Sequence, residues 1–204
     1  MENTAGFWDK IAEKYAKQPI EDEASYEHKL EVTRRYLTPN SSVLEFGCGT
    51  GSTALLHAPF VHHILGIDFS KGMIDIAQTK LINTDINNVS FKQISIEELN
   101  SDFQYDVIMG MSALHLLIDK DAVIHKIYDL LPKGGVFISS TACLGDFLKL
   151  FKVIGPIGRW LGLLPLVKVF TEDELVKSIK NAGFTVEYQW RPGKSKAVFL
   201  VAKK

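Results

Sequence analysis

The chain has 204 residues, which is enough for one α/β domain with a well-buried core and leaves little for a second. Its formal net charge of −1 supplies no basic surface for a nucleic-acid backbone, and its two cysteines form neither a CxxC metal motif nor a disulfide framework. The first residues lack a basic region followed by an apolar core, so we expect no signal peptide and a cytoplasmic protein.

Helical spacing of apolar residues predicts two N-terminal helices, near residues 6–17 and 24–37, which end before Pro39. Strand-like and helix-like segments then alternate, which is typical of a mostly parallel sheet with helices on both faces. We expect strands near residues 42–46, 62–67, 89–93, 105–110, 134–140, 184–190 and 196–202. We expect further helices near residues 51–58, 71–82, 120–131 and 172–182.

The ends of these elements carry their own signals. Ser70 and Thr171 are suited to cap the helices that follow them, and Glu174 would complete a capping box with Thr171. The run RPGK at 191–194 separates the last two strands and predicts a hairpin. The expected fold class is therefore α/β: a doubly wound, seven-stranded, mostly parallel sheet with an antiparallel C-terminal hairpin strand.

The stretch Val43–Gly51 reads VLEFGCGTG and carries three glycines at alternate positions. It predicts a buried strand that ends in a tight turn close to a ligand, because glycine permits positive φ and has no Cβ to obstruct the approach. A second apolar run ends at Asp68, whose carboxylate can accept hydrogen bonds from both hydroxyls of a ribose. Together the two features predict a nucleoside-binding site.

The spacing of the glycines narrows the choice of nucleoside. Ser52 stands where a dinucleotide fingerprint needs its last glycine, which argues against a nicotinamide-dependent oxidoreductase. Glu45 suits an ammonium group better than a pyrophosphate. The pattern E-x-G-x-G-x-G resembles the class I S-adenosylmethionine-dependent methyltransferases, in particular the small-molecule group of ubiquinone and menaquinone biosynthesis.

The resemblance extends over roughly residues 6–142 and 171–204, and includes the strings GIDFS at 66–70, YDVIMG at 105–110 and LPKGGV at 131–136. It implies a Rossmann-like fold and S-adenosyl-L-methionine as the cofactor. It also implies a set of cofactor-binding residues, namely Tyr15, Glu45, Gly47, Cys48, Gly49, Gly51, Asp68, Phe69, Met73, Ser95, Ile96, Met109, Gly110 and Met111.

Several of these assignments have alternatives. Asp68 could instead serve as an acid at a helix N-terminus, while Met73 and Tyr15 could simply pack in the core. Ser95 stands where the family commonly has an aspartate that binds adenine, and a serine accepts hydrogen bonds more weakly than a carboxylate does. Glu97 is a neighbouring acid that could compensate.

The reaction of such an enzyme depends mainly on placing the acceptor in line with the methyl group, and a general base is needed only when the acceptor must lose a proton. His115 is the candidate base, since it follows the fourth strand where substrates approach; the alternative is a histidine that helps this loop to fold. We expect no metal ion. Sequence motifs for methylation of nucleobases are absent.

The segment 144–170 is strongly apolar, but its basic residues and two prolines exclude a transmembrane helix. It could form short helices that cap the core, a lid over a lipophilic acceptor, or a contact with a membrane surface. We expect one methyltransferase domain over 1–204, with a helical cap at 1–40, an apolar helical insertion at 143–170, and a small apolar or aromatic acceptor. A non-catalytic protein that binds the same cofactor is the main rival.

Overall fold

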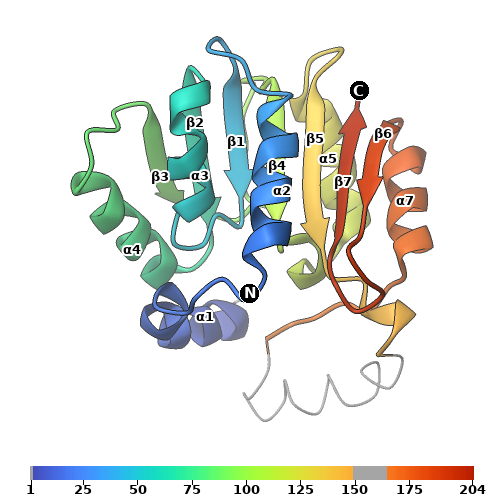
Figure 1. The fold of residues 1–204 in the computed structure, drawn as a ribbon, viewed down its shortest axis with the longest axis horizontal. Helices are drawn as coiled ribbons and strands as arrows, with labels where there is room; N and C mark the ends of the chain where they lie inside the picture. The colour runs from blue at the N-terminus through green and yellow to red at the C-terminus, as the bar shows by residue number, and fades with distance from the viewer. Residues whose placement is uncertain (1, 149–164) are drawn as a thin grey trace.

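The computed structural model describes residues 2–148 and 165–204, and within them seven strands form a single sheet (Figure 1). The strand order is β3-β2-β1-β4-β5-β7-β6. The strands are β1 Ser42–Phe46, β2 His63–Asp68, β3 Val89–Gln93, β4 Val107–Met111, β5 Val136–Thr141, β6 Thr185–Trp190 and β7 Val198–Lys203.

Strands β1 to β5 pair in parallel, whereas β7 runs antiparallel to both β5 and β6. This arrangement confirms the expected fold class, including the C-terminal hairpin. The hairpin enters the sheet through its second strand, so that β7 lies beside β5 and β6 forms the edge. Four of the five residues of β1 are buried, and Ser42 is partly exposed. Burial of this kind is expected for a central parallel strand that is covered on both faces.

The helices are α1 Glu2–Ala16, α2 Glu23–Arg34, α3 Ser52–His57, α4 Lys71–Ile82, α5 Lys120–Leu130 and α7 Glu172–Asn181, with short 3₁₀ turns η1 Ala58–Phe60, η2 Leu114–Leu116 and η3 Leu144–Asp146. Helices α2, α3 and α4 pack on one face of the sheet, and α5 and α7 pack on the other. Each face therefore has its own apolar core, with the sheet between them (Figure 1).

The predicted helix ends agree with the structure to within one residue except at the start of α1, which begins at Glu2 and not near residue 6, and at the end of α2. Helix α2 was expected to reach residue 37 but ends at Arg34, after which Tyr36 and Leu37 donate their N–H groups to carbonyls three residues back. Helix α3 gives way to η1 where Pro59, which lacks an N–H group, interrupts the α-helical ladder. The predicted cap at Ser70 and the Thr171–Glu174 capping box are confirmed.

Helix α1 lies beyond the carboxyl ends of the parallel strands, on the side of β2 and β3, and its helical neighbour there is α4 (Figure 1). On the other side of this end, the N–H of Gly145 donates a hydrogen bond of 2.9 Å to the carbonyl of Phe170. Most of the apolar segment 144–170, for which the sequence leaves three interpretations, consists of residues 149–164, which lie outside the described residues. No helix in the described part of the chain is long and apolar enough to cross a bilayer.

Candidate active site

Two cavities open at the carboxyl ends of the parallel strands, where open α/β sheets bind their ligands. The Asp68 cavity has a volume of about 330 Å³ and extends over the ends of β2 and β3 toward η2. The Glu45 cavity has a volume of about 360 Å³ and lies beneath α2. The described residues that line both cavities are Tyr15, Gly47, Gly49, Met111 and Ser112.

The glycine turn after β1 separates the two cavities. Gly49 has φ of +53°, and a Cβ placed there would meet no atom within 4 Å, so the turn leaves open space in front of its backbone. The N–H of Cys48 donates a hydrogen bond of 3.0 Å to the carbonyl of Ile67, which ties the turn to β2. The turn therefore presents bare backbone to both cavities, as the sequence predicts.

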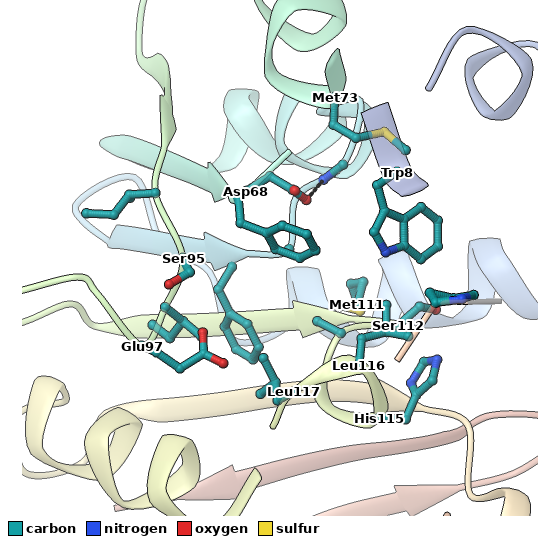
Figure 2. A pocket seen from close by; sticks show the side chains of 18 of the residues that line it. Trp8, Asp68, Met73, Ser95, Glu97, Met111, Ser112, His115, Leu116 and Leu117 are labelled. Carbon is teal, nitrogen blue, oxygen red and sulfur yellow. Dashed lines mark hydrogen bonds between the residues drawn. The ribbon is translucent and has the colours of Figure 1, made fainter. Parts of the chain in front are cut away.

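Asp68 ends β2 with its carboxylate in the wall of the Asp68 cavity (Figure 2). Its Oδ2 accepts a hydrogen bond of 3.0 Å from the N–H of Gly49, and its Oδ1 accepts one of 2.9 Å from the N–H of Ser70. Burial raises the pKa of this carboxyl, while the two backbone N–H groups act in the opposite direction. Each oxygen keeps a second lone pair with which to accept a hydrogen bond from a ligand.

Glu45 presents an unusual carboxyl to the second cavity. The residue is 1% exposed, and its Oε2 has no hydrogen-bond partner in the part of the chain that the structure describes. Burial, with a smaller contribution from the charge of Asp68, raises the pKa of Glu45 to about 8. A buried carboxyl without a partner is costly to the fold, and a cation in the cavity would remove that cost.

Lys29 lines the same cavity from α2. Its Nζ donates a hydrogen bond of 3.1 Å to Oγ of Ser140, and burial lowers the pKa of the ammonium group. The Glu45 cavity therefore contains one carboxyl and one ammonium group. That combination is complementary to the two charged groups of a free amino acid.

Beyond Asp68, the wall of the Asp68 cavity is formed by Phe69, Met73 and the stretch 94–97 (Figure 2). Oγ of Ser95 accepts a hydrogen bond of 3.2 Å from the N–H of Glu98, which uses one of its two lone pairs within its own turn. The carboxylate of Glu97 also faces the cavity and accepts no hydrogen bond from another described side chain or N–H group. This wall is mostly apolar, with the hydroxyl of Ser95 and the carboxylate of Glu97 as its polar groups.

The far end of the Asp68 cavity is apolar and is lined by Leu116, Leu117 and Val167 around His115 (Figure 2). Nδ1 of His115 is buried and has no partner among the described residues, and burial lowers the pKa of this imidazole to about 4. The carbonyl of His115 accepts a hydrogen bond of 2.7 Å from the N–H of Lys168, which holds the returning chain against this end.

Comparison with known proteins decides the family. A family model described as "Methyltransferase domain" matches residues 37–194. The chain belongs to the class I S-adenosylmethionine-dependent methyltransferases. It is 29% identical over 151 residues to a ubiquinone biosynthesis O-methyltransferase of Acinetobacter baumannii, an alignment that covers 71% of this chain and 64% of the relative. It is 30% identical over 166 residues to a malonyl-[acyl-carrier protein] O-methyltransferase of Priestia megaterium, covering 78% and 60%.

The chain thus spans less than two thirds of the length of these two curated relatives. The crystal structure of YcgJ from Bacillus subtilis superimposes with a TM-score of 0.68 at 18% identity, over 87% of this chain and 96% of that one. At this identity the structural likeness shows the fold, which is the Rossmann-like fold of the methyltransferase family.

The cofactor of this family fits the residues of the two cavities. Oε2 of Glu45, which is buried and without a partner among the described residues, matches the ammonium group of S-adenosylmethionine, and the spare lone pairs of Asp68 match its ribose hydroxyls. The bare backbone at Gly49 leaves room for the part of the molecule that joins these two groups.

Eleven of the fourteen residues predicted to bind cofactor line one cavity or both. The other three, Gly51, Met109 and Gly110, line neither cavity among the described residues. A Cβ at Gly51 would lie 2.5 Å from Cζ of Phe91, and one at Gly110 would lie 2.2 Å from Cζ of Phe46, so these glycines make room for packed rings. Met109 is fully buried in the core beneath α2 and α3.

Several residues of the site were not predicted, Trp8 and Lys29 among them. Trp8 lines the Asp68 cavity from α1, and Lys29 lines the Glu45 cavity from α2. Trp8 stands seven positions before Tyr15 in one helix, and such residues share a face, so a helical pattern could have pointed to it. Lys29 has no comparable signal, because only the packing of α2 over β5 brings it to Ser140.

Proposed function

We propose that the protein transfers a methyl group from S-adenosylmethionine to a small apolar or aromatic acceptor by in-line displacement. The observation that carries the proposal is the glycine turn at Gly47–Gly49, which is hydrogen-bonded to Asp68 on one side and lies beside the unpartnered Glu45 on the other. A single ligand with a ribose and a free amino group accounts for both carboxyl groups.

In this proposal the adenosine part binds in the Asp68 cavity, with its ribose hydroxyls donating to Asp68 and its ring between Met73 and Ile96. The amino-acid part binds in the Glu45 cavity, where Glu45 accepts hydrogen bonds from the ammonium group and Lys29 pairs with the carboxylate. The cofactor supplies a methyl group bonded to a sulfonium, which is a good leaving group for direct displacement.

The acceptor would bind at the apolar end of the Asp68 cavity, among Leu116, Leu117 and Val167. This lining excludes water and favours a hydrophobic or aromatic molecule over a charged one. Both curated relatives are named as O-methyltransferases, which supports oxygen as the acceptor atom.

His115 is the group in this region that could remove a proton from a hydroxyl acceptor. Its imidazole is neutral at physiological pH because burial lowers its pKa to about 4, and its Nδ1 has no hydrogen-bond partner in the part of the chain that the structure describes. The bound cofactor would supply an electrophilic methyl group to the acceptor oxygen, and His115 would take the proton that the hydroxyl loses. S-adenosylhomocysteine and the methyl ether are the products.

Two measurements test the proposal. Calorimetric titration with S-adenosylmethionine and S-adenosylhomocysteine should show binding of both. Transfer of a labelled methyl group to a metabolite extract, and then to matched phenols and amines of equal size, should label hydrophobic oxygen acceptors. Binding without transfer to any acceptor would favour a non-catalytic cofactor-binding protein. Labelling of polar amines or nucleic acids alone would refute the proposed acceptor.

A further inference from the structure

Helix α1 contributes Trp8 and Tyr15 to the cavities, although it belongs to neither face of the sheet. The two rings meet edge to face with their centroids 6.1 Å apart, and Figure 2 shows Trp8 beside Met73 at the edge of the Asp68 cavity. The contacts that hold α1 in this position therefore determine whether Trp8 and Tyr15 remain in the walls of the cavities.

Asp9 connects α1 to the first turn of α4. Its Oδ1 accepts a hydrogen bond of 2.6 Å from Oγ of Ser70 and one of 2.9 Å from the N–H of Gly72. Among the described residues, Asp9 is the α1 side chain that hydrogen-bonds to another element. A carboxylate near the first N–H groups of a helix is also favoured by the helix dipole.

Ser70 links this contact to the cofactor site. Its hydroxyl donates to Asp9 while its backbone N–H donates to Oδ1 of Asp68, over 2.9 Å. Ser70 thus holds both the carboxylate of Asp9 and the carboxylate of Asp68, which is the one proposed to bind ribose. A displacement of α1 would remove a partner from Ser70 immediately beside Asp68.

The two helices also approach closely at this point. A Cβ at Gly72 would lie 3.2 Å from Cα of Asp9 and 3.2 Å from Cβ of Ala12, which is tighter than ordinary packing. Glycine at 72 therefore permits the N–H of that residue to reach Asp9.

We propose that Asp9 is a positioning residue that fastens α1 to the start of α4 and thereby holds Trp8 and Tyr15 at the cofactor site. The proposal rests on the proposed binding of S-adenosylmethionine in the Asp68 cavity. By thermodynamic linkage, a cofactor that gains affinity from the docked helix must stabilise the docked helix by the same factor.

The test combines hydrogen exchange of the α1 amides with titration by S-adenosylhomocysteine, using the full chain. In Asp9→Ala, exchange over 5–16 should be faster without ligand, and the Kd should rise about tenfold, as expected for loss of hydrogen bonds to a charged group. Asp9→Asn keeps an acceptor oxygen and should stay within about threefold of the wild type. Asp75→Ala is the matched control, because it removes an exposed aspartate of α4 whose ion pair is with Lys71 of the same helix.

Gly72→Ala separates positioning from a general effect on stability. Alanine favours a helix more than glycine does, so a residue 72 that acted only within its own helix would give an unchanged or higher melting temperature with unchanged affinity. The proposal instead predicts faster exchange in α1 and a raised Kd. Unchanged exchange in Asp9→Ala would overturn the fastening of α1, and faster exchange with unchanged affinity would overturn its role in the site. If the wild type failed to bind S-adenosylhomocysteine, the proposed function would be refuted. Hydrogen exchange of the unliganded variants would still test whether Asp9 fastens α1 to α4.

Discussion

The backbone N–H of Gly49 donates a hydrogen bond to Oδ2 of Asp68 over a distance of 3.0 Å. This bond joins the glycine turn after β1 to the carboxyl end of β2, which are the two motifs most informative in the sequence. Asp68 consequently shapes the turn and faces the cavity at the same time. Its proposed ligand would be bound by a carboxylate whose position is already set by two backbone N–H groups.

Replacing Asp68 by alanine should raise the Kd for S-adenosylhomocysteine at least tenfold, because charge-assisted hydrogen bonds to the ribose are lost. Asp68→Asn should have an intermediate effect, since the amide keeps one acceptor oxygen. Calorimetric titration measures both. Asp129→Ala removes an exposed acid from α5 and serves as the control; an affinity unchanged in Asp68→Ala would refute the ribose assignment.

The parts of the site that the sequence predicts are those set by local structure. Gly47, Gly49 and Asp68 occupy the ends of two buried strands, and both strand periodicity and glycine spacing are visible in a short window. The parallel pairing of β1 to β5 follows in the same way from the alternation of strands and helices.

The parts that escape prediction depend on tertiary packing. Lys29 reaches the Glu45 cavity because α2 lies over the end of β5, and no pattern within α2 reveals that contact. Gly110 reads as part of a cofactor loop, but it is glycine because the ring of Phe46 occupies the space of a side chain. Distant residues therefore decide whether a glycine serves a ligand or a core.

Glu45 should make cofactor binding release a proton. Its pKa of about 8 in the unliganded protein means that the carboxyl is mostly protonated near neutral pH, and an ammonium group beside it favours the ionised form. Affinity for S-adenosylhomocysteine should therefore increase as the pH rises toward 8, by up to about tenfold per pH unit. Titrations in buffers of different ionisation enthalpy measure the released proton, and Glu45→Gln should release none.

The same carboxyl should make the unliganded protein less stable at alkaline pH. Because the folded state raises the pKa of Glu45 to about 8, its contribution to stability is complete below the pKa of the unfolded carboxyl and is lost as the pH rises through 8. Glu45→Gln is neutral at every pH and should exceed the wild type by roughly 2–4 kcal/mol in unfolding free energy at high pH. Urea denaturation at acidic and alkaline pH measures this difference; an equal difference at both would contradict the assignment.

Glu97 should take over the recognition of adenine that Ser95 performs weakly. Oγ of Ser95 is uncharged and already accepts one hydrogen bond from the N–H of Glu98, so the carboxylate of Glu97 is the stronger acceptor for the adenine amino group in this stretch of the wall. Glu97→Gln should weaken binding of S-adenosylhomocysteine about three- to tenfold and reduce the preference for it over the deaminated analogue, which lacks that donor. Glu98→Gln, a change of the exposed neighbouring acid, is the control.

His115 should affect turnover more than binding. If its imidazole takes the acceptor proton, His115→Gln should lower kcat by roughly 10²-fold or more while leaving the KM for S-adenosylmethionine nearly unchanged. Burial lowers the pKa of His115 to about 4, so protonation of this group should not limit kcat/KM of the wild type between about pH 5 and 8.

The control for this last prediction is His125→Gln, which changes a histidine on the exposed side of α5. A histidine that only supports the loop after β4 would give a different result, because its loss would lower the melting temperature and raise the KM together. Equal loss of turnover with a phenol and with an acceptor that carries no removable proton would also exclude proton transfer to His115, since the second reaction needs no base.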